Sequence, residues 1–224
     1  MELCPASLEI AERYKLLIGG ITPRPIAAVS TISPTGAPNL APFSFFAGVG
    51  SNPMTVLFCP ANDANGSEKD TLRNCKPAAE GGTGEFVVNV VSESLIRRVV
   101  AAAEPLPPDR SEFEFASLGC TPAFAVKPPR LAESPVCFEC RTLQVIRTGR
   151  DVPSAGNIVL GEVVHVYVAD EVADGRLHLN ADRIAAIGRM GGPEYCTTRA
   201  RLALPMGSAS LAAPEPFGRA TGHS

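Results

Sequence analysis

The chain has 224 residues, with 20 lysines and arginines against 23 aspartates and glutamates and a formal net charge of -3. It carries no basic run that would indicate nucleic acid or an anionic membrane, and no window approaches the roughly 18 apolar residues of a membrane span. The seven cysteines are scattered and odd in number, which argues against a disulfide framework, and the first residues lack the apolar core of a signal peptide. We therefore expect a cytoplasmic protein with reduced thiols and one sizeable core.

The first predicted element is a helix over residues 7–18, whose apolar side chains recur at helical spacing before Gly19 and Gly20 stop it. We expect this helix to pack on the body of the protein.

The hydrophobic content of 45% lies toward the apolar side of the globular range. An obligate dimer would bury the additional apolar surface.

A β-hairpin follows, with strands at 23–31 and 39–46 and a proline and a glycine in the reversal between them. Pro42 has no backbone N–H to give to a neighbouring strand, so it predicts a sheet edge or a bulge. Ser44 stands among three aromatic residues with a hydroxyl that needs a partner. A polar group in that setting suggests a ligand.

The later elements are mostly strands. Ser67 and Asp70 have the spacing of a capping box, and Ser92 is a candidate N-cap for the helix after it. The predicted elements are strands at 54–59, 85–91, 136–146 and 157–170, helices at 67–74 and 92–104, and a hairpin-like turn at 170–179. We therefore predict an α+β, mostly β fold. One domain covers 1–205, and residues 206–224 form a mobile arm rich in Ala, Ser, Pro and Gly.

Several motifs that might suggest other chemistry do not predict it here. Cys137 and Cys140 have CxxC spacing, but residues three apart on a strand face opposite sides, so they do not predict a metal site or an easy disulfide. His165 lies in an alternating strand, where a structural histidine is the commoner outcome. The run at 188–192 lacks the full glycine fingerprint of a dinucleotide-binding fold.

Six short stretches carry a family resemblance. They are RPIAAVST at 24–31, NLAPFSFF at 39–46, KDTLRN at 69–74, GEFVVN at 84–89, GEVVH at 161–165 and GRMGGPEY at 188–195. In order and spacing they resemble the flavin reductase-like proteins of the FMN-binding split-barrel superfamily, over roughly residues 14–195. The resemblance implies a split β-barrel of Greek-key type with a few flanking helices, FMN as cofactor, and a homodimer with flavin sites near the subunit interface.

The activity implied by the resemblance is an NAD(P)H:flavin oxidoreductase, in which NADH or NADPH gives hydride to flavin N5 and the reduced flavin passes electrons to an acceptor. No side chain need act as an acid or base, because the cofactor carries the redox step. A flavoredoxin-like electron carrier without its own nicotinamide site is the alternative. A third possibility is a barrel that binds another cofactor or none.

The phosphate of FMN needs cations, hydroxyls and backbone N–H groups. Lys69, Thr71 and the first turn of the helix at 67–74 could supply them, whereas Asp70 would repel the phosphate unless its carboxylate caps the helix or pairs with an arginine. An ordinary capped surface helix is the alternative. Arg24, fixed between two prolines, could clamp the phosphate with its guanidinium or be a surface charge.

The flavin ring needs a flat apolar slot and polar groups at one edge. Residues 41–44 could form that slot, or they could be core aromatics of a plain strand, and the hydroxyls of Ser30 and Thr31 could face a ligand or cap a turn. The resemblance implies that Arg189 and Tyr195 close over the flavin of a partner subunit. The predicted cofactor-binding set is Arg24, Ser30, Thr31, Asn39, Ala41, Pro42, Phe43, Ser44, Lys69, Asp70, Thr71, Arg189 and Tyr195.

Overall fold

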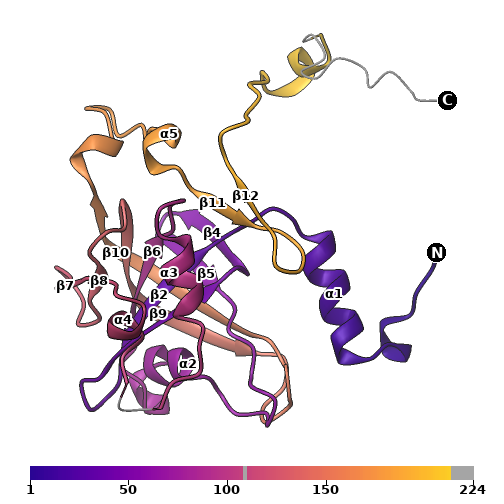
Figure 1. Cartoon of the computed structure of the whole chain (residues 1–224), viewed down its shortest axis with the longest axis vertical. Helices are drawn as coiled ribbons and strands as arrows, with labels where there is room; N and C mark the ends of the chain where they lie inside the picture. Colours follow the sequence, from indigo (N-terminus) through magenta and orange to yellow (C-terminus); the bar gives the residue numbers. More distant parts are fainter. Residues whose placement is uncertain (108–109, 213–224) are drawn as a thin grey trace.

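The structure is a computed structural model that describes residues 1–107 and 110–212 (Figure 1). The strands are β1 (Arg24–Pro25), β2 (Ala27–Ile32), β3 (Pro38–Phe43), β4 (Phe46–Ser51), β5 (Met54–Phe58), β6 (Glu85–Val90), β7 (Cys120–Thr121), β8 (Arg130–Leu131), β9 (Val136–Arg147), β10 (Asn157–Val168), β11 (Ile187–Arg189) and β12 (Tyr195–Thr197). The helices are α1 (Ile10–Gly20), α2 (Asp70–Cys75), α3 (Ile96–Ala101), α4 (Glu112–Phe115) and α5 (Ala181–Ile184), with 3-10 turns η1 (Pro5–Ser7), η2 (Ala78–Glu80), η3 (Asp170–Val172) and η4 (Gly207–Ala212).

The main sheet has seven strands in the order β3-β2-β6-β9-β10-β5-β4, and every neighbouring pair is antiparallel. A small sheet β1-β11-β12 and the pair β7-β8 accompany it. The prediction of an α+β, mostly β fold is confirmed, and the strands expected at 54–59, 85–91, 136–146 and 157–170 are present with small differences at their ends. Closure into a Greek-key barrel stays a prediction.

The inner strand β6 is covered on both faces. Phe86 and Val88 pack with Phe58 in one buried cluster, whereas Val87 packs with Cys137 in another. Continuous apolar runs are typical of strands covered in this way. Cys140 belongs to the first cluster, so the prediction that the two cysteines of the CxxC motif face opposite sides of the strand is confirmed.

The predicted hairpin is formed by β2 and β3. Ala28 pairs with Pro42 and Thr31 pairs with Asn39. In the reversal, the backbone N–H of Ser33 donates to the carbonyl of Ala37 at 2.8 Å. Because β3 is an outer strand of the main sheet, Pro42 lies at an edge, as its missing N–H predicts. One side of β3 is thereby left for other groups.

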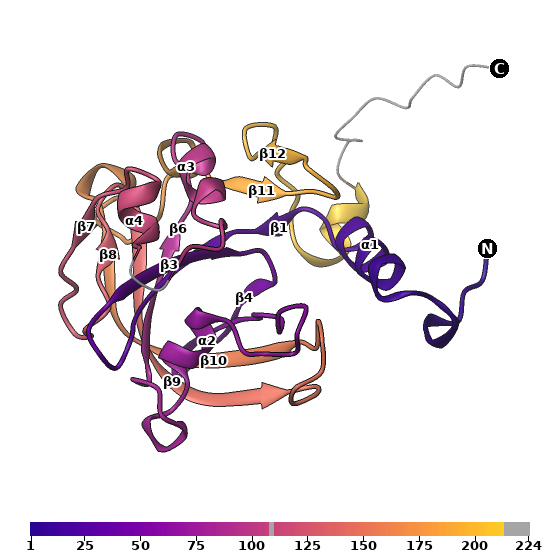
Figure 2. The same ribbon diagram turned by 60° about the horizontal axis from the view of Figure 1, so that its bottom comes forward.

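Helix α1 differs from the prediction, because it extends away from the body (Figures 1 and 2). The helix has no buried residue, and Tyr14, Leu16 and Leu17 are each more than 50% exposed. Its packing on the body was therefore wrongly predicted. Within the described residues, its hydrogen bonds to the body lie at its end, where Arg24 donates to the carbonyl of Ile18. Apolar side chains of the earlier turns stay exposed.

Two predicted helix caps were also wrong. Lys69 is the N-cap of α2, without a side-chain cap, because the N–H of Ser67 is held in a turn by the carboxylate of Asp63. Helix α3 begins at Ile96, four residues after Ser92, because Ser92 forms a β-bridge with Ala186. A local turn in the first place and a tertiary bridge in the second therefore displaced the capping signal.

The C-terminal arm predicted for 206–224 begins with the short turn η4, and residues 213–224 lie outside the described residues. The hairpin-like turn at 170–179 is confirmed by a bridge between Ala173 and Leu179. None of the helices in the described ranges combines the length and the apolar character that crossing a membrane demands.

Candidate functional site

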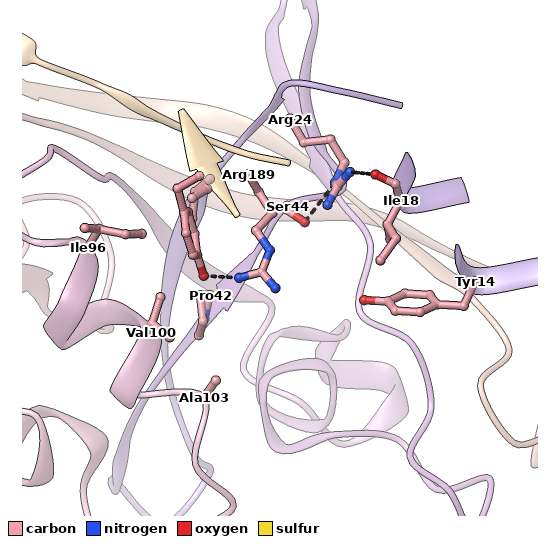
Figure 3. A pocket seen from close by; sticks show the side chains of 11 residues that line it. Tyr14, Ile18, Arg24, Pro42, Ser44, Ile96, Val100, Ala103 and Arg189 are labelled. Atoms are coloured by element: carbon pink, nitrogen blue, oxygen red, sulfur yellow. Dashed lines mark hydrogen bonds between the residues drawn. The ribbon is translucent and has the colours of Figure 1, made fainter. Parts of the chain in front are cut away.

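A groove follows the outer side of the edge strand β3 and consists of two adjoining cavities. The Arg24 cavity measures 260 Å³ and the Lys69 cavity 290 Å³, and Pro42 and Ala103 line both. Ile96 and Val100 of α3 and Ala103, two residues after its end, form the wall opposite β3 (Figure 3). Each cavity alone falls just below the range of about 300–1,000 Å³ typical of small-molecule sites, and the two together fall within it.

The Lys69 cavity is built on a chain of amide and hydroxyl side chains. Thr71 is 2% exposed, and its Oγ1 accepts a hydrogen bond from Nδ2 of Asn39 at 3.1 Å. The same Nδ2 lies 3.1 Å from Oγ1 of Thr31, which also accepts from Asn74 at 3.1 Å. Thr31 therefore supports Asn39 and Thr71 from below, without lining either cavity itself.

Lys69 is exposed at the start of α2, and its side chain makes no hydrogen bond or ion pair with any residue that the structure describes. Asp70, its neighbour, pairs with Arg73. Asp70 was expected to repel a phosphate at this helix unless its carboxylate capped the helix or paired with an arginine. The pairing with Arg73 meets that condition. Lys69 is then a cation that remains available in the cavity.

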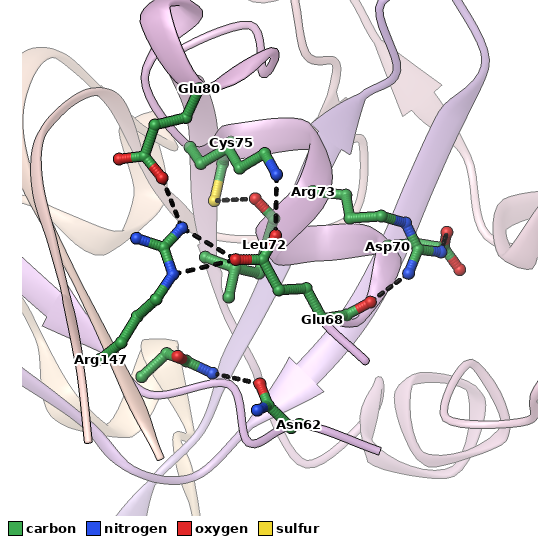
Figure 4. A network of polar contacts seen from close by, with 10 residues as sticks. Asn62, Glu68, Asp70, Leu72, Arg73, Cys75, Glu80 and Arg147 are labelled. Atoms are coloured by element: carbon green, nitrogen blue, oxygen red, sulfur yellow. Dashed lines mark hydrogen bonds and ion pairs between the residues drawn. The ribbon is translucent and has the colours of Figure 1, made fainter. Parts of the chain in front are cut away.

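An ion-pair network lies behind this end of the groove (Figure 4). Glu68 pairs with Lys76 at 2.8 Å and with Arg147 at 2.8 Å, and Arg147 also pairs with Glu80 at 2.6 Å. Burial acts to raise the pKa of Glu68, but the hydrogen bonds from Lys76 and Arg147 outweigh it and hold that pKa below its ordinary value. Glu68 is therefore ionised and paired at neutral pH.

In the Arg24 cavity the arginine itself is 3% exposed and committed to the fold. Its Nη1 donates to the carbonyls of Ile18 and Ile21 at 2.6 Å each, and its Nη2 donates to the carbonyl of Met190 at 3.0 Å. Burial lowers the pKa of Arg24 from its ordinary value. Its guanidinium fork, predicted to clamp a phosphate, is thus engaged by backbone carbonyls of the same chain.

Ser44 and Arg24 form the polar edge of this cavity. Nε of Arg24 donates to Oγ of Ser44 at 3.2 Å, which supplies the partner that the sequence predicted the hydroxyl to need. Arg189 and Tyr195 complete the cavity: the Arg189 guanidinium donates to the Tyr195 hydroxyl and lies 4.5 Å from the centre of its ring. The pairing of β11 with β1 brings them there. They line the groove of their own chain, and their closure over the flavin of a partner subunit stays a prediction.

Most of the predicted residues meet in the groove. Lining it are Arg24, Asn39, Ala41, Pro42, Phe43, Ser44, Lys69, Asp70, Thr71, Arg189 and Tyr195. Ser30 does not line it, because its fully buried hydroxyl donates to the carbonyl of Pro129 at 2.5 Å. Residues 41–44 line one side of the groove, and their use as a slot for a flavin ring stays a prediction.

Sequence reasoning missed Glu112, which comes from the short helix α4 and lines the Lys69 cavity. Its Oε2 accepts from the backbone N–H of Leu40 at 3.1 Å, so it bonds the free side of the edge strand. Burial, with a smaller contribution from the charge of Asp70, raises the pKa of Glu112. The surrounding sequence, 111–127, has no clear period, so no signal indicated this position. In the described ranges, no group of three or more His, Cys, Asp or Glu residues could hold a metal ion.

Comparisons with known proteins define the class. Residues 19–188 match the family model described as flavin reductase like domain. A relative, the uncharacterized protein BH2278 of Halalkalibacterium halodurans, is 40% identical over 197 residues, which cover 87% of this chain and 91% of that protein. This chain therefore belongs to the flavin reductase-like family.

Solved structures agree with this membership. Nitrilotriacetate monooxygenase component B from Bacillus cereus is 31% identical with a TM-score of 0.83, covering 91% of this chain and 98% of that one. The 2-nitrobenzoate 2-nitroreductase NbaA of Pseudomonas fluorescens is 30% identical with a TM-score of 0.79, covering 93% and 97%. A Shewanella frigidimarina protein named for its split barrel domain shares the fold, with a TM-score of 0.73 at 19% identity over 92% of this chain and 100% of that one. The chain is thus a flavin-related protein of oxidoreductase type with split-barrel relatives.

Proposed function

We propose that this protein is an FMN-dependent oxidoreductase that takes hydride from NADH or NADPH and passes electrons to an acceptor. The observation that carries the proposal is the groove along β3, which joins a cation and hydroxyl at one end to an apolar slot with a polar edge at the other. Bound there, the flavin would supply the redox chemistry, accepting hydride at N5. The chain's own residues bind it, orient it and limit its contact with water.

The phosphate belongs at the Lys69 end in this proposal. Lys69 provides a positive charge that no described side chain neutralises, and Thr71 provides a hydroxyl oriented by Asn39. A phosphate dianion is held by charge-assisted hydrogen bonds of this kind. The buried Arg24 takes no part in phosphate binding, because three backbone carbonyls occupy its fork.

The ring belongs between β3 and α3. Ala41, Pro42 and Phe43 give one wall, and Val100 and Ala103 give the other. Ser44, fixed by Arg24, places a hydroxyl at the edge. Flat apolar walls suit the benzenoid part of a flavin, and the polar edge suits its pyrimidine part. The catalytic contribution of these residues is positional, since stacking donor and ring in contact favours transfer.

Anaerobic titration tests the redox step. Purified protein loaded with FMN should lose its flavin absorption when NADH or NADPH is added. A loaded protein that neither nucleotide reduces would contradict the nicotinamide-dependent activity, and reduction by a protein partner alone would favour the flavoredoxin-like carrier. Failure to take up FMN at all would favour a barrel with another cofactor or none.

We also propose that the protein is a homodimer with the groove near the interface. The apolar side chains of α1 are uncovered, and Tyr14 and Ile18 from the same helix line the Arg24 cavity. A second copy would cover this helix. Light scattering should report twice the mass of one chain, and Leu17→Glu should shift it to the single-chain mass while Lys15→Glu, on the same helix, should not. A monomeric wild type would contradict the dimer.

The remaining proposals concern the whole chain. We propose a cytoplasmic location, which is consistent with seven free cysteines. We propose residues 1–205 as the flavin-binding domain, since the last residues lining the groove precede 205. Limited proteolysis that removes residues after 205 without loss of FMN binding would support this division.

A further inference from the structure

The Lys69 cavity presents a difficulty for a phosphate, because most of the charged residues that line it are acidic. Lysine and arginine contribute Lys69 and Arg73, whereas the acids are Asp63, Glu68, Asp70, Glu104 and Glu112. Like charges in a partly buried site repel a dianion strongly, since water screens them less there. Glu104 is exposed, so water screens its charge. The cavity can accept a phosphate only if the other carboxylates are compensated.

Three of the acids are engaged locally. Asp63 accepts from the backbone N–H groups of Asn65 and Ser67 at 2.8 and 2.9 Å. Asp70 pairs with Arg73. Glu112 accepts from the N–H of Leu40 at 3.1 Å. The partners of these three carboxylates either line the cavity or lie close in the chain to residues that line it.

Glu68 is different, because it directly precedes Lys69 in the chain and its compensation comes from a distant strand. Arg147, the last residue of β9, donates from Nε at 2.9 Å and from Nη2 at 2.8 Å to Oε1 of Glu68. Its Nη2 also reaches Oε2 of Glu80 at 2.6 Å. Arg147 lines neither cavity of the groove, and its side chain is 9% exposed.

These contacts orient the carboxylate of Glu68. Figure 4 shows Arg147 and Glu80 on one side of Glu68, and Asp70 with Arg73 on the other. The two hydrogen bonds from one guanidinium fix both the direction and the charge of the carboxylate. Lys76 adds a second cation at 2.8 Å. Without Arg147, Glu68 would keep one partner and be free to turn toward Lys69 and the cavity.

We propose that Arg147 is a positioning residue for phosphate recognition. By holding and neutralising Glu68, it lets Lys69 act as the net cation of an acid-lined site and makes the groove prefer a phosphorylated flavin over riboflavin. This inference rests on the proposed function, because it concerns the same groove. It assigns a role in cofactor selectivity to a side chain that does not touch the cofactor.

The test compares dissociation constants for FMN and riboflavin, measured by flavin fluorescence. Arg147→Met should weaken FMN about tenfold, the equivalent of about 1.4 kcal/mol, and leave riboflavin unchanged. Adding Glu68→Gln to Arg147→Met should return FMN affinity to within about threefold of wild type, because the uncompensated charge is gone. Arg141→Met, on the same strand and exposed, is the matched control and should change neither constant.

Glu68→Gln alone keeps an oxygen that can accept from Arg147, so it tests the idea even if Arg147→Met folds poorly. It should bind FMN at least as tightly as wild type. Equal weakening of FMN and riboflavin by Arg147→Met, no recovery in the double variant, or FMN-selective weakening by Glu68→Gln would each overturn the inference. Wild-type protein that binds FMN no better than riboflavin would refute the phosphate site itself, a result distinct from these three.

Discussion

The two ends of the groove use their cations in opposite ways. Arg24 is buried and donates to three backbone carbonyls and to Ser44, whereas Lys69 is exposed and donates to none of the described residues. Burying a guanidinium costs free energy unless its N–H groups are hydrogen-bonded, so the charge of Arg24 serves to stabilise the fold. An exposed ammonium stays hydrated, so it can lack a protein partner without any cost in the free energy of folding. The comparison teaches that a conspicuous arginine at a site can be structural, whereas an exposed lysine nearby keeps its N–H donors available for a ligand.

Strand β3 joins the two ends, because Pro42 lines both cavities. Changes at the Arg24 end should therefore appear first as loss of stability, and changes at the Lys69 end first as loss of affinity. Substitutions at each end separate the two kinds of contribution.

The largest expected effect is on stability. Arg24→Met removes the hydrogen bonds that the guanidinium donates to the carbonyls of Ile18, Ile21 and Met190, and a hydrogen bond to a charged group contributes about 1.5–3 kcal/mol. We expect the free energy of unfolding to fall by more than about 3 kcal/mol, measured by urea denaturation. Arg13→Met, an exposed arginine of α1, should change it by no more than about 0.5 kcal/mol. A loss below about 1 kcal/mol for Arg24→Met would contradict the structural role.

The next effect is on affinity. Lys69→Ala and Thr71→Ala should each weaken FMN binding by about 1.5–3 kcal/mol, because each removes a hydrogen bond to a charged phosphate. Calorimetric titration measures this directly, and Lys69→Ala should leave the urea midpoint almost unchanged. Thr71→Ser, which keeps the hydroxyl, is the control and should bind nearly as well as wild type. Unchanged affinity in both alanine variants would place the phosphate elsewhere.

Much of the hairpin that carries the site could be predicted from sequence, because its signals are local. The turn between β2 and β3, the edge position of Pro42 and the opposite faces of Cys137 and Cys140 all follow from turn chemistry or from the two-residue period of a strand. The capping signals were local too. They failed where a turn at Asp63 and a bridge at Ser92 offered the backbone a different partner.

The division of labour between cations could not be predicted, because it depends on distant partners. Arg24 meets Met190 across 166 positions and Glu68 meets Arg147 across 79, and neither pairing has a spacing signal. Helix α1 shows a related limit. Its periodicity indicates an apolar face, but periodicity does not say whether the body of the same chain covers that face.

The smallest expected effect sharpens the comparison at the Lys69 end, where Glu112 is a half-buried acid. Burial raises its pKa above the ordinary 4.5. Between the two values the folded protein binds more protons than the unfolded chain, so the free energy of unfolding falls as pH rises through this window. Glu112→Gln removes that loss and keeps an oxygen for the N–H of Leu40. The variant should gain about 0.5 kcal/mol over wild type at pH 8 and less at pH 4.

Urea denaturation at the two pH values measures this difference, and Glu114→Gln, exposed on the same helix α4, is the matched control. A gain that is the same at pH 4 and pH 8 would mean that the amide improves packing without any proton linkage. A gain confined to pH 8 would show that ionising Glu112 destabilises the groove. In that case the carboxylate of Glu112 lowers the free energy of unfolding at the Lys69 end. This decrease is far smaller than the one expected at the other end when the buried Arg24 is removed.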